Sequence, residues 1–188
     1  MQLLFATSNP HKIEEVKAIL APAGFDVIGL DSLGEQPPEP VEDGATFADN
    51  ARIKARHGRN ASPGEAWVAG EDSGIEVAAL GGGPGIESAR WAAEPVVHLL
   101  AELEGVEERG ARYVCEVVAL DRNAAEAKAS GRLEGTIAHE PSGTEGFGYD
   151  PIFIPRGESL TVAMLGDSWK AANSHRAQAA RALAALLR

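Results

Sequence analysis

Short apolar runs alternate with amphipathic stretches along this chain. Residues 2–6, which are apolar from Leu3 onward, are predicted to form a buried strand. Apolar side chains then recur at helical spacing over residues 13–20, and residues 25–30 form another apolar run. Asn9 is typical of a helix N-cap, and Pro10 occupies the favoured first helical position. The pattern therefore predicts a β–α–β unit with a polar loop at the carboxyl end of its first strand.

The same alternation continues to the end of the chain and predicts an α/β fold. Residues 34–44 are rich in Pro and Glu and are predicted to be a loop, and residues 143–148 are predicted to be a glycine-rich turn. Helices are expected over residues 46–57, 87–93, 96–103 and 174–187, and strands over residues 67–70, 75–80, 111–121, 126–133 and 151–155. The polar segment Glu71-Asp72-Ser73-Gly74 is expected to end one strand before the next begins.

Composition narrows the class of protein. The 188 residues, 44 % of them hydrophobic, suit a single domain with a core of its own. The net charge of −11 argues against nucleic-acid binding, which requires a basic face, but it is compatible with small phosphorylated ligands. No apolar stretch approaches the roughly 18 residues of a membrane span. The single cysteine, Cys115, is expected to be a buried hydrophobe, and no signal peptide is recognisable, so we expect a cytoplasmic protein.

The loop after the first predicted strand carries the first candidate site. Thr7, Ser8 and Asn9 precede the helix, and Lys12 lies one turn into it. Backbone N–H groups at a helix N-terminus and a nearby ammonium both favour an anion such as a phosphate. The Gly-rich spacing of a P-loop is absent. An ordinary N-cap with a solvated lysine is the alternative interpretation.

Carboxylates supply the second candidate site. Glu42 lies in the proline-rich loop, and Asp72 follows Glu71 at the predicted strand end. Mg²⁺ prefers carboxylate oxygens and often bridges to substrate phosphates, and a carboxylate beside the metal can accept a proton from water. In a chain with 28 acidic residues, a solvated surface role is the alternative for each of them.

Two further segments carry aromatic and basic groups. Gly146-Phe147-Gly148-Tyr149-Asp150-Pro151 predicts a rigid turn that presents a ring on which a purine can stack. An ordinary loop with Phe147 in the core is equally compatible with this segment. Lys170 and Ser174-His175-Arg176 place cations at a helix start, where they oppose the helix dipole unless an anion is present. This conflict indicates a functional role.

In this order and spacing, the segments resemble the inosine triphosphate pyrophosphatase family, hydrolases of non-standard purine nucleoside triphosphates. The resemblance covers nearly the whole chain. It is carried by Ala6-Thr7-Ser8-Asn9-Pro10-His11-Lys12, Thr46-Phe47, Asn50-Ala51, Lys54-Ala55-Arg56, Asp72-Ser73-Gly74-Ile75-Glu76-Val77, Pro84-Gly85-Ile86, Ser88-Ala89-Arg90, Gly146-Phe147-Gly148-Tyr149-Asp150-Pro151-Ile152-Phe153 and Ser174-His175-Arg176. Glu71 departs from the family pattern, which commonly has two aspartates before Ser-Gly.

The resemblance implies an elongated α/β fold of one domain over residues 1–188, with two lobes, a long mixed sheet flanked by helices and the active site in the cleft between the lobes. It also implies a cytoplasmic homodimer, without nucleic-acid or membrane partners, that uses Mg²⁺ to convert ITP, dITP or XTP to the monophosphate and pyrophosphate. Asp72 would be the general base and Lys12 a catalytic cation, with Glu42 and Asp72 as metal ligands. The substrate would be bound by Thr7, Ser8, Asn9, Pro10, His11, Lys12, Lys54, Ser73, Phe147, Gly148, Tyr149, Asp150, Lys170, His175 and Arg176.

Two alternatives stay open at this point. One is a related pyrophosphatase for modified pyrimidine nucleotides, and the other is a nucleotide-binding sensor without turnover. The Ser-His-Arg segment and the Phe-Gly-Tyr-Asp turn favour a purine. The joint presence of Lys12, Glu42 and Asp72 favours an enzyme, because a sensor has no need of a base beside a metal.

Overall fold

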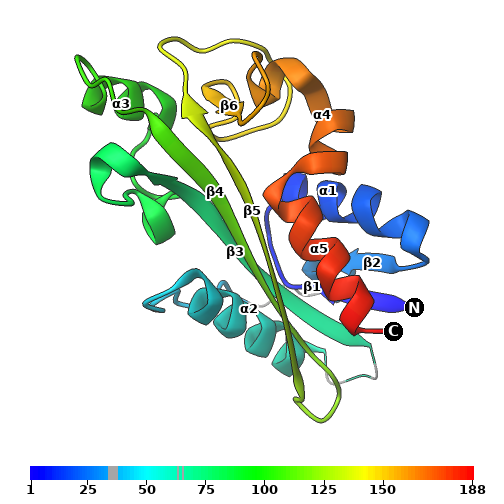
Figure 1. Ribbon diagram of the computed structural model, residues 1–188. Coiled ribbons are helices and arrows are strands. Elements are labelled where there is room, and N and C mark those ends of the chain that lie inside the picture. The colour runs from blue at the N-terminus through cyan, green and yellow to red at the C-terminus, as the bar shows by residue number, and fades with distance from the viewer. Residues whose placement is uncertain (34–37, 63, 65) are drawn as a thin grey trace. The chain divides into compact units, whose positions relative to one another are not determined.

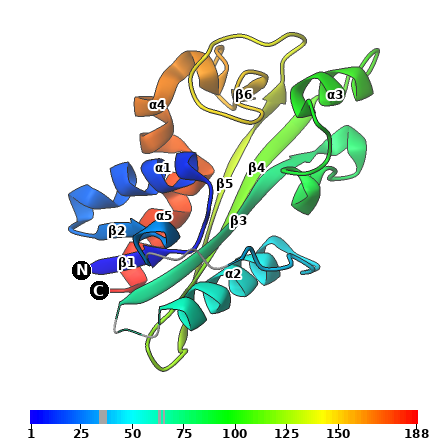
Figure 2. The same cartoon turned by 180° about the vertical axis from the view of Figure 1, so that it is seen from behind.

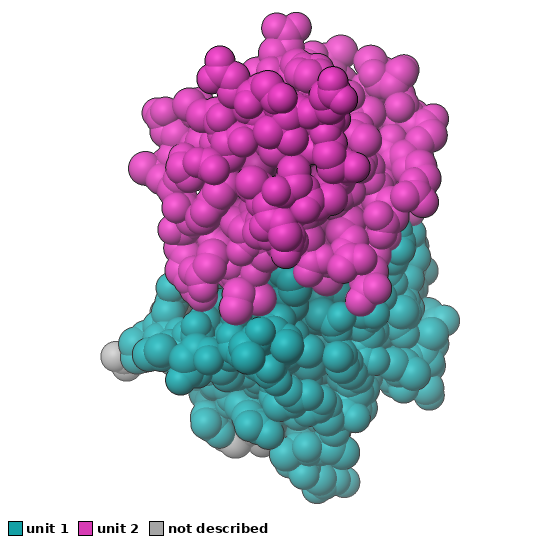
Figure 3. All heavy atoms as spheres, turned by 60° about the vertical axis from the view of Figure 1, so that its left-hand side comes forward, with its two compact units in different colours: residues 1–72, 115–131, 176–188 teal, residues 73–114, 132–175 magenta. Residues whose placement is uncertain are grey.

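The computed structural model describes residues 1–33, 38–62, 64 and 66–188 of the chain (Figure 1). It divides into two compact units (Figure 3). Unit 1 consists of residues 1–72, 115–131 and 176–188, and unit 2 consists of residues 73–114 and 132–175. Each unit therefore contains segments that are distant in the sequence.

The strands of the described residues form a six-stranded sheet in the order β2-β1-β3-β4-β5-β6. Strand β1 pairs in parallel with both β2 and β3, whereas β5 and β6 are antiparallel, so the sheet is mixed. This confirms the predicted α/β class with a mixed sheet and flanking helices; the cleft between lobes stays a prediction. The strands are β1 (Gln2–Phe5), β2 (Asp26–Gly29), β3 (Trp67–Val77), β4 (Gly110–Leu120), β5 (Glu126–Ile137) and β6 (Phe153–Pro155).

Helices surround these strands. Within unit 1, α2 and α5 lie on opposite sides of β3, as the front and back views both show (Figures 1 and 2). The α-helices are α1 (Pro10–Leu20), α2 (Phe47–Ala61), α3 (Pro95–Glu102), α4 (Val162–Asn173) and α5 (His175–Leu186). Short 3-10 segments are η1 (Ala21–Ala23), η2 (Leu30–Leu33), η3 (Ala78–Leu80) and η4 (Gly85–Glu87).

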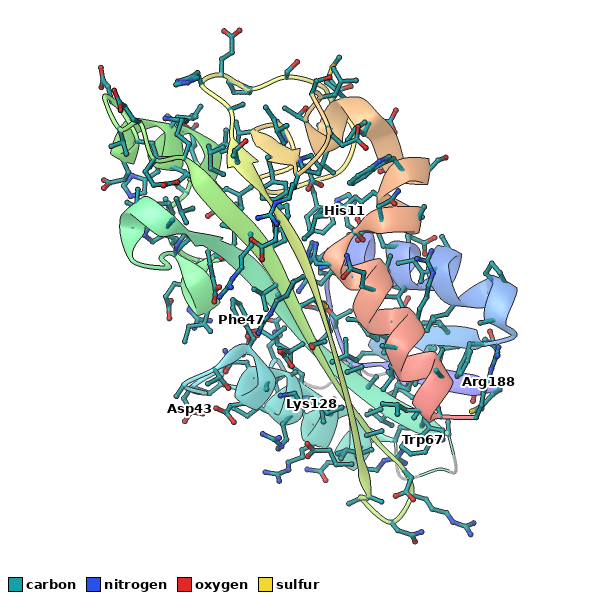
Figure 4. All side chains as sticks on the ribbon, viewed as in Figure 1. His11, Asp43, Phe47, Trp67, Lys128 and Arg188 are labelled. Atoms are coloured by element: carbon teal, nitrogen blue, oxygen red, sulfur yellow. The ribbon has the colours of Figure 1, made fainter. Side chains whose placement is uncertain are left out.

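Local signals in the sequence explain where the helices of unit 1 begin. The Asn9 side chain accepts hydrogen bonds from the backbone N–H groups of His11 and Lys12, which caps α1. Thr46 caps α2 in the same way through the backbone N–H of Asp49. Figure 4 shows Asp43 and Phe47 at this end of α2. Both helices therefore start where the sequence predicts.

Each unit has an apolar core. In unit 1, α2 packs Ala51 and Ala55 against Val118 and Leu120 of β4, and all four side chains are buried. In unit 2, the core joins side chains from strands, helices and loops, and these are Ile75, Val77, Leu99, Leu103, Ala111, Tyr113, Ile137, Tyr149, Ile152, Phe153 and Val162. The two separate cores fix the strands on which the candidate site residues lie.

Three predictions of local structure were wrong. The strands expected over residues 67–70 and 75–80 are the single strand β3, followed by η3. The helix expected over residues 87–93 is replaced by the short η4 and turns. Helix α4 was missed because Gly166, at φ +84°, interrupts its helical pattern. Of the loop predicted over residues 34–44, residues 34–37 lie outside the described residues, and the rest contains neither helix nor strand.

Gly70 permits close packing between β3 and α2. A Cβ atom at this position would overlap the backbone carbonyl oxygen of Ala51 and the backbone nitrogen of Ala55. Gly70→Ala is therefore expected to lower the free energy of unfolding by about 3 kcal/mol, as overpacking does. Chemical denaturation measures the change. Gly64→Ala is the control, because a Cβ there meets no atom within 4 Å; an equal loss in both variants would contradict the packing assignment.

Candidate functional site

The predicted phosphate loop lies between β1 and α1 in unit 1. The Thr7 hydroxyl accepts a hydrogen bond from the backbone N–H of Asn9 at 3.2 Å, and the Ser8 hydroxyl donates to Glu39. His11 is exposed in the first turn of α1 (Figure 4). The Asn9 cap aligns this turn and so sets the direction in which the next residue, Lys12, leaves the helix.

A buried carboxylate, Glu71, is the partner of Lys12. The Lys12 ammonium lies 3.1 Å from Glu71 Oε2, and the Arg176 guanidinium lies 3.2 Å from Oε1. Arg176 also contacts Glu15 at 2.5 Å. The Cys115 thiol donates to Glu71 Oε1 at 3.4 Å. We call these five residues the Glu71 cluster; it joins α1, β3, β4 and α5 within unit 1.

Burial and charge shape the chemistry of the Glu71 cluster. Burial raises the pKa of the Cys115 thiol, and the adjacent Glu71 carboxylate raises it further. Burial opposes the charged form of Arg176, but Glu71 and Glu15 outweigh it, so the Arg176 pKa is raised. Arg176 therefore keeps its charge, and Cys115 is the neutral, buried residue that the sequence predicts.

The next residue of β3, Asp72, is the centre of a second group in unit 1. The Lys54 ammonium lies 2.8 Å from Asp72 Oδ1 and 2.8 Å from Glu42 Oε2. The Asn50 amide donates to Asp72 Oδ2 at 3.2 Å. We call Glu42, Asn50, Lys54 and Asp72 the Asp72 cluster. It brings together the two predicted metal ligands and one predicted phosphate contact.

The environment of Asp72 suits a proton acceptor. Burial raises the pKa of its carboxyl, and the positive charges of Lys54 and Lys12 only partly offset this effect. Burial would lower the pKa of Lys54, but the Asp72 and Glu42 carboxylates outweigh it and raise that pKa. A carboxylate with a raised pKa is a stronger base than an ordinary aspartate.

The oxygen donors of the Asp72 cluster, the carboxylates of Glu42 and Asp72, are of the kind that bind a divalent cation. Its two carboxylates already converge on one positively charged group, and one ammonium leaves a net negative charge among them. Within the described part of the chain, no group of three or more His, Cys, Asp or Glu residues is arranged to hold a metal. A metal here would therefore depend on two carboxylates, with water and substrate completing its ligands, as is usual for Mg²⁺.

In unit 2, Asp150 organises the predicted base-binding residues. Its Oδ2 accepts from the Lys170 ammonium at 2.6 Å and from the backbone N–H of Phe147 at 2.9 Å. Its Oδ1 accepts from the Tyr113 hydroxyl at 3.1 Å. The Lys170 ammonium also lies 4.1 Å from the centre of the Phe147 ring. We call Tyr113, Phe147, Asp150 and Lys170 the Asp150 cluster.

The glycines on either side of Phe147 allow this turn. Gly146 and Gly148 have φ of +76° and +63°, a region that favours glycine. A Cβ at Gly146 would also overlap the Asp150 carboxylate. Tyr149 lies in the core, where its hydroxyl donates to the Ser88 carbonyl at 3.1 Å and burial raises its pKa to about 12. The structure thus confirms the predicted turn.

Sequence reasoning missed three residues that hold the predicted ones in place. Glu15 holds Arg176, Asn50 holds Asp72, and Tyr113 holds Asp150. Asn50 was recognised only as part of a matching segment. Glu15 and Tyr113 had no local signal, because an acidic residue on a helix and a tyrosine in a strand are common.

Comparison with known proteins identifies the family of this chain. A model of the Ham1 family matches residues 3–186. The chain belongs to the Ham1 family. This confirms the predicted family, since many curated relatives carry the name dITP/XTP pyrophosphatase.

Two such relatives of this Ham1 chain illustrate the similarity. The protein of Corynebacterium efficiens is 43 % identical over 97 % of this chain and 95 % of its own. The protein of Mycobacterium tuberculosis H37Rv is 46 % identical over 99 % of this chain and 93 % of its own. Among solved structures, the Staphylococcus aureus Ham1 protein has a TM-score of 0.85 and 34 % identity over 100 % of this chain and 98 % of its own. A nucleoside-triphosphatase / dITP/XTP pyrophosphatase of Mycobacterium abscessus has a TM-score of 0.76 and 39 % identity, with full coverage of both chains.

Glu71→Gln tests the importance of the buried charge. The substitution removes the negative charge beside Lys12 and Arg176 while keeping the shape of the side chain. We expect the free energy of unfolding to fall by about 3–5 kcal/mol, because a buried cation loses its partner. Denaturant titration measures this loss.

The matched control is Glu126→Gln, which breaks a partly exposed ion pair with Arg52 at 2.8 Å. Its cost is expected to stay below about 1 kcal/mol. Equal losses in the two variants would show that the Glu71 charge contributes no more than a surface carboxylate.

Proposed function

We propose that this protein hydrolyses non-standard purine nucleoside triphosphates, with dITP and XTP as substrates, to the monophosphate and pyrophosphate. The observation that carries the proposal is the position of two acidic residues side by side on one strand. Glu71 holds Lys12 beside the predicted phosphate loop, and Asp72 lies with Glu42 around the Lys54 ammonium. The names of the relatives support the same reaction. They give no support to the pyrimidine enzyme or to the sensor.

In this proposal the phosphates bind in unit 1. Lys12 and Lys54 provide two ammonium groups whose positions are fixed by carboxylates before any ligand arrives. Fixed cations stabilise the charge that develops on the phosphate oxygens without a large reorganisation. Residues Thr7–His11 supply hydroxyl, amide and backbone groups beside Lys12.

Glu42 and Asp72 are the residues that would hold Mg²⁺. When bound there, the metal would neutralise phosphate charge and lower the pKa of a coordinated water. Asp72 would accept the proton of the attacking water at a carboxylate oxygen. The water oxygen would form a bond to the α-phosphorus while the α–β anhydride linkage breaks, so that the monophosphate forms and pyrophosphate leaves.

The base would be recognised by Phe147, through stacking, and by donors on Lys170, His175 and Arg176. Hypoxanthine and xanthine carry a carbonyl at position six, where adenine carries an amino group. The Lys and Arg side chains only donate hydrogen bonds, so they pair with the carbonyl oxygen and would face the amino group of adenine with another donor, which is strongly unfavourable in a buried site. Ser73, Gly148, Tyr149 and Asp150 complete the proposed substrate contacts.

A cytoplasmic homodimer is part of the same proposal and rests on the family resemblance. Among the described residues, no helix is both long enough and apolar enough to cross a membrane. Gel filtration with light scattering measures the oligomeric state directly.

Asp72→Asn tests the proposed base. The amide keeps the shape of the side chain but cannot accept the proton of water, so turnover of dITP and XTP should fall by about two decades or more. Pyrophosphate release measures the rate. The control is Asp26→Asn, the same chemical change at an exposed residue of unit 1, which should keep full activity. Near-normal turnover of the Asp72 variant would exclude the assigned role.

Metal removal tests the proposed cofactor. Dialysis against EDTA should abolish pyrophosphate release, and added Mg²⁺ should restore it, because the two carboxylates then regain their cation. A second readout is direct: calorimetric titration of Mg²⁺ into the metal-free protein should give binding that the double variant Glu42→Gln, Asp72→Asn loses. Full turnover in the presence of EDTA would contradict the assignment.

A further inference from the structure

Tyr113 connects two of the predicted base-binding residues of unit 2. It lies in β4 and is 6 % exposed. Its hydroxyl donates to Asp150 Oδ1 at 3.1 Å. The Tyr113 ring makes a second contact: it stacks on the His175 imidazole with 4.5 Å between ring centres and 9° between the planes. One rigid side chain therefore touches both Asp150 and His175.

Both contacts restrict the orientation of groups that belong to the predicted base-binding residues. The Asp150 carboxylate has one oxygen occupied by Lys170 and Phe147, and the Tyr113 hydroxyl occupies the other, which fixes the plane of the carboxylate. Near-parallel stacking fixes the plane of the His175 ring and hence the directions of its nitrogen atoms. Phe153 packs against Tyr113 at 4.5 Å and holds the tyrosine itself.

From this geometry we propose that Tyr113 is a positioning residue for purine recognition. It acts through Asp150 and His175, setting their orientation before the nucleotide binds, and has no part in the breaking of the phosphate linkage. The proposal rests on the proposed function and deepens it. Loss of the Tyr113 hydroxyl should weaken base binding and leave phosphate binding and chemistry intact, because Lys12, Lys54 and Asp72 belong to other clusters.

The test compares two substitutions at this residue. Tyr113→Phe keeps the ring but removes the hydroxyl; Tyr113→Leu removes both contacts. We expect Tyr113→Phe to raise KM for dITP and XTP about tenfold, the scale of one buried hydrogen bond to a charged group, with kcat nearly unchanged. Tyr113→Leu should raise KM further. Pyrophosphate, which lacks a base, should inhibit all variants with the same inhibition constant.

A signal from the protein itself reports the stacking. In proton NMR of histidine-labelled protein, the Tyr113 ring should shift the His175 ring resonances; this shift should persist in Tyr113→Phe and vanish in Tyr113→Leu. The matched control is Leu99→Val, which loosens the same apolar core at a fully buried side chain outside the Asp150 cluster. It should lose stability without a change in KM.

The outcomes separate the two proposals. A wild-type protein that leaves dITP and XTP intact would overturn the proposed function and this inference with it. Normal wild-type turnover with an unchanged KM in Tyr113→Phe would overturn only the role of Tyr113. An equal rise in KM in Leu99→Val, or a weakened inhibition by pyrophosphate in Tyr113→Phe, would show that Tyr113 acts through general stability, and would also overturn it.

Discussion

The pairing of the Glu71 carboxylate inside unit 1 is the interaction on which the rest of that unit depends. Its side chain has no solvent exposure, so its negative charge is tolerated only because Lys12 and Arg176 approach it from two different helices. Because both cations must reach Glu71, α1 and α5 each turn one particular face, the one that carries Lys12 or Arg176, toward β3. The same requirement keeps Lys12 beside the predicted phosphate loop, so that fold stability and the candidate site share one set of charges.

The neighbouring charges of β3 are balanced differently. In the Glu71 cluster two cations match two carboxylates, and this balance suits a structural group that needs no ligand. In the Asp72 cluster one ammonium faces two carboxylates, and this group keeps an attraction for a further cation. Glu71 and Asp72 are both carboxylates, but the charges around them differ: those around Glu71 are balanced, and those around Asp72 are not.

Local signals made much of the fold predictable. Asn9-Pro10 and Thr46 mark helix starts through short-range hydrogen bonds, so α1 and α2 begin where the sequence indicates. The continuity of β3 was not predictable in this way. Four polar residues in its middle resemble a strand end, and they stay within the strand because Glu71 finds Arg176 as a partner 105 residues away. Prediction of the candidate site was limited in the same way. Its motif residues were identified, but Glu15 and Tyr113 were not, because their contacts with Arg176 and Asp150 join segments that are distant in the sequence.

Arg176 shows how fold and recognition constrain each other. The sequence suggests a guanidinium that reads the oxygen at position six of the base, and the structure places that group against Glu15 and Glu71. A guanidinium carries five N–H donors in a rigid plane, so two carboxylates can fix its orientation. Holding it this way costs desolvation during folding, and in the proposed function the nucleotide would meet a donor whose direction is already set. The same logic applies to Lys170 on Asp150, which makes preorganised charge the common design of both units.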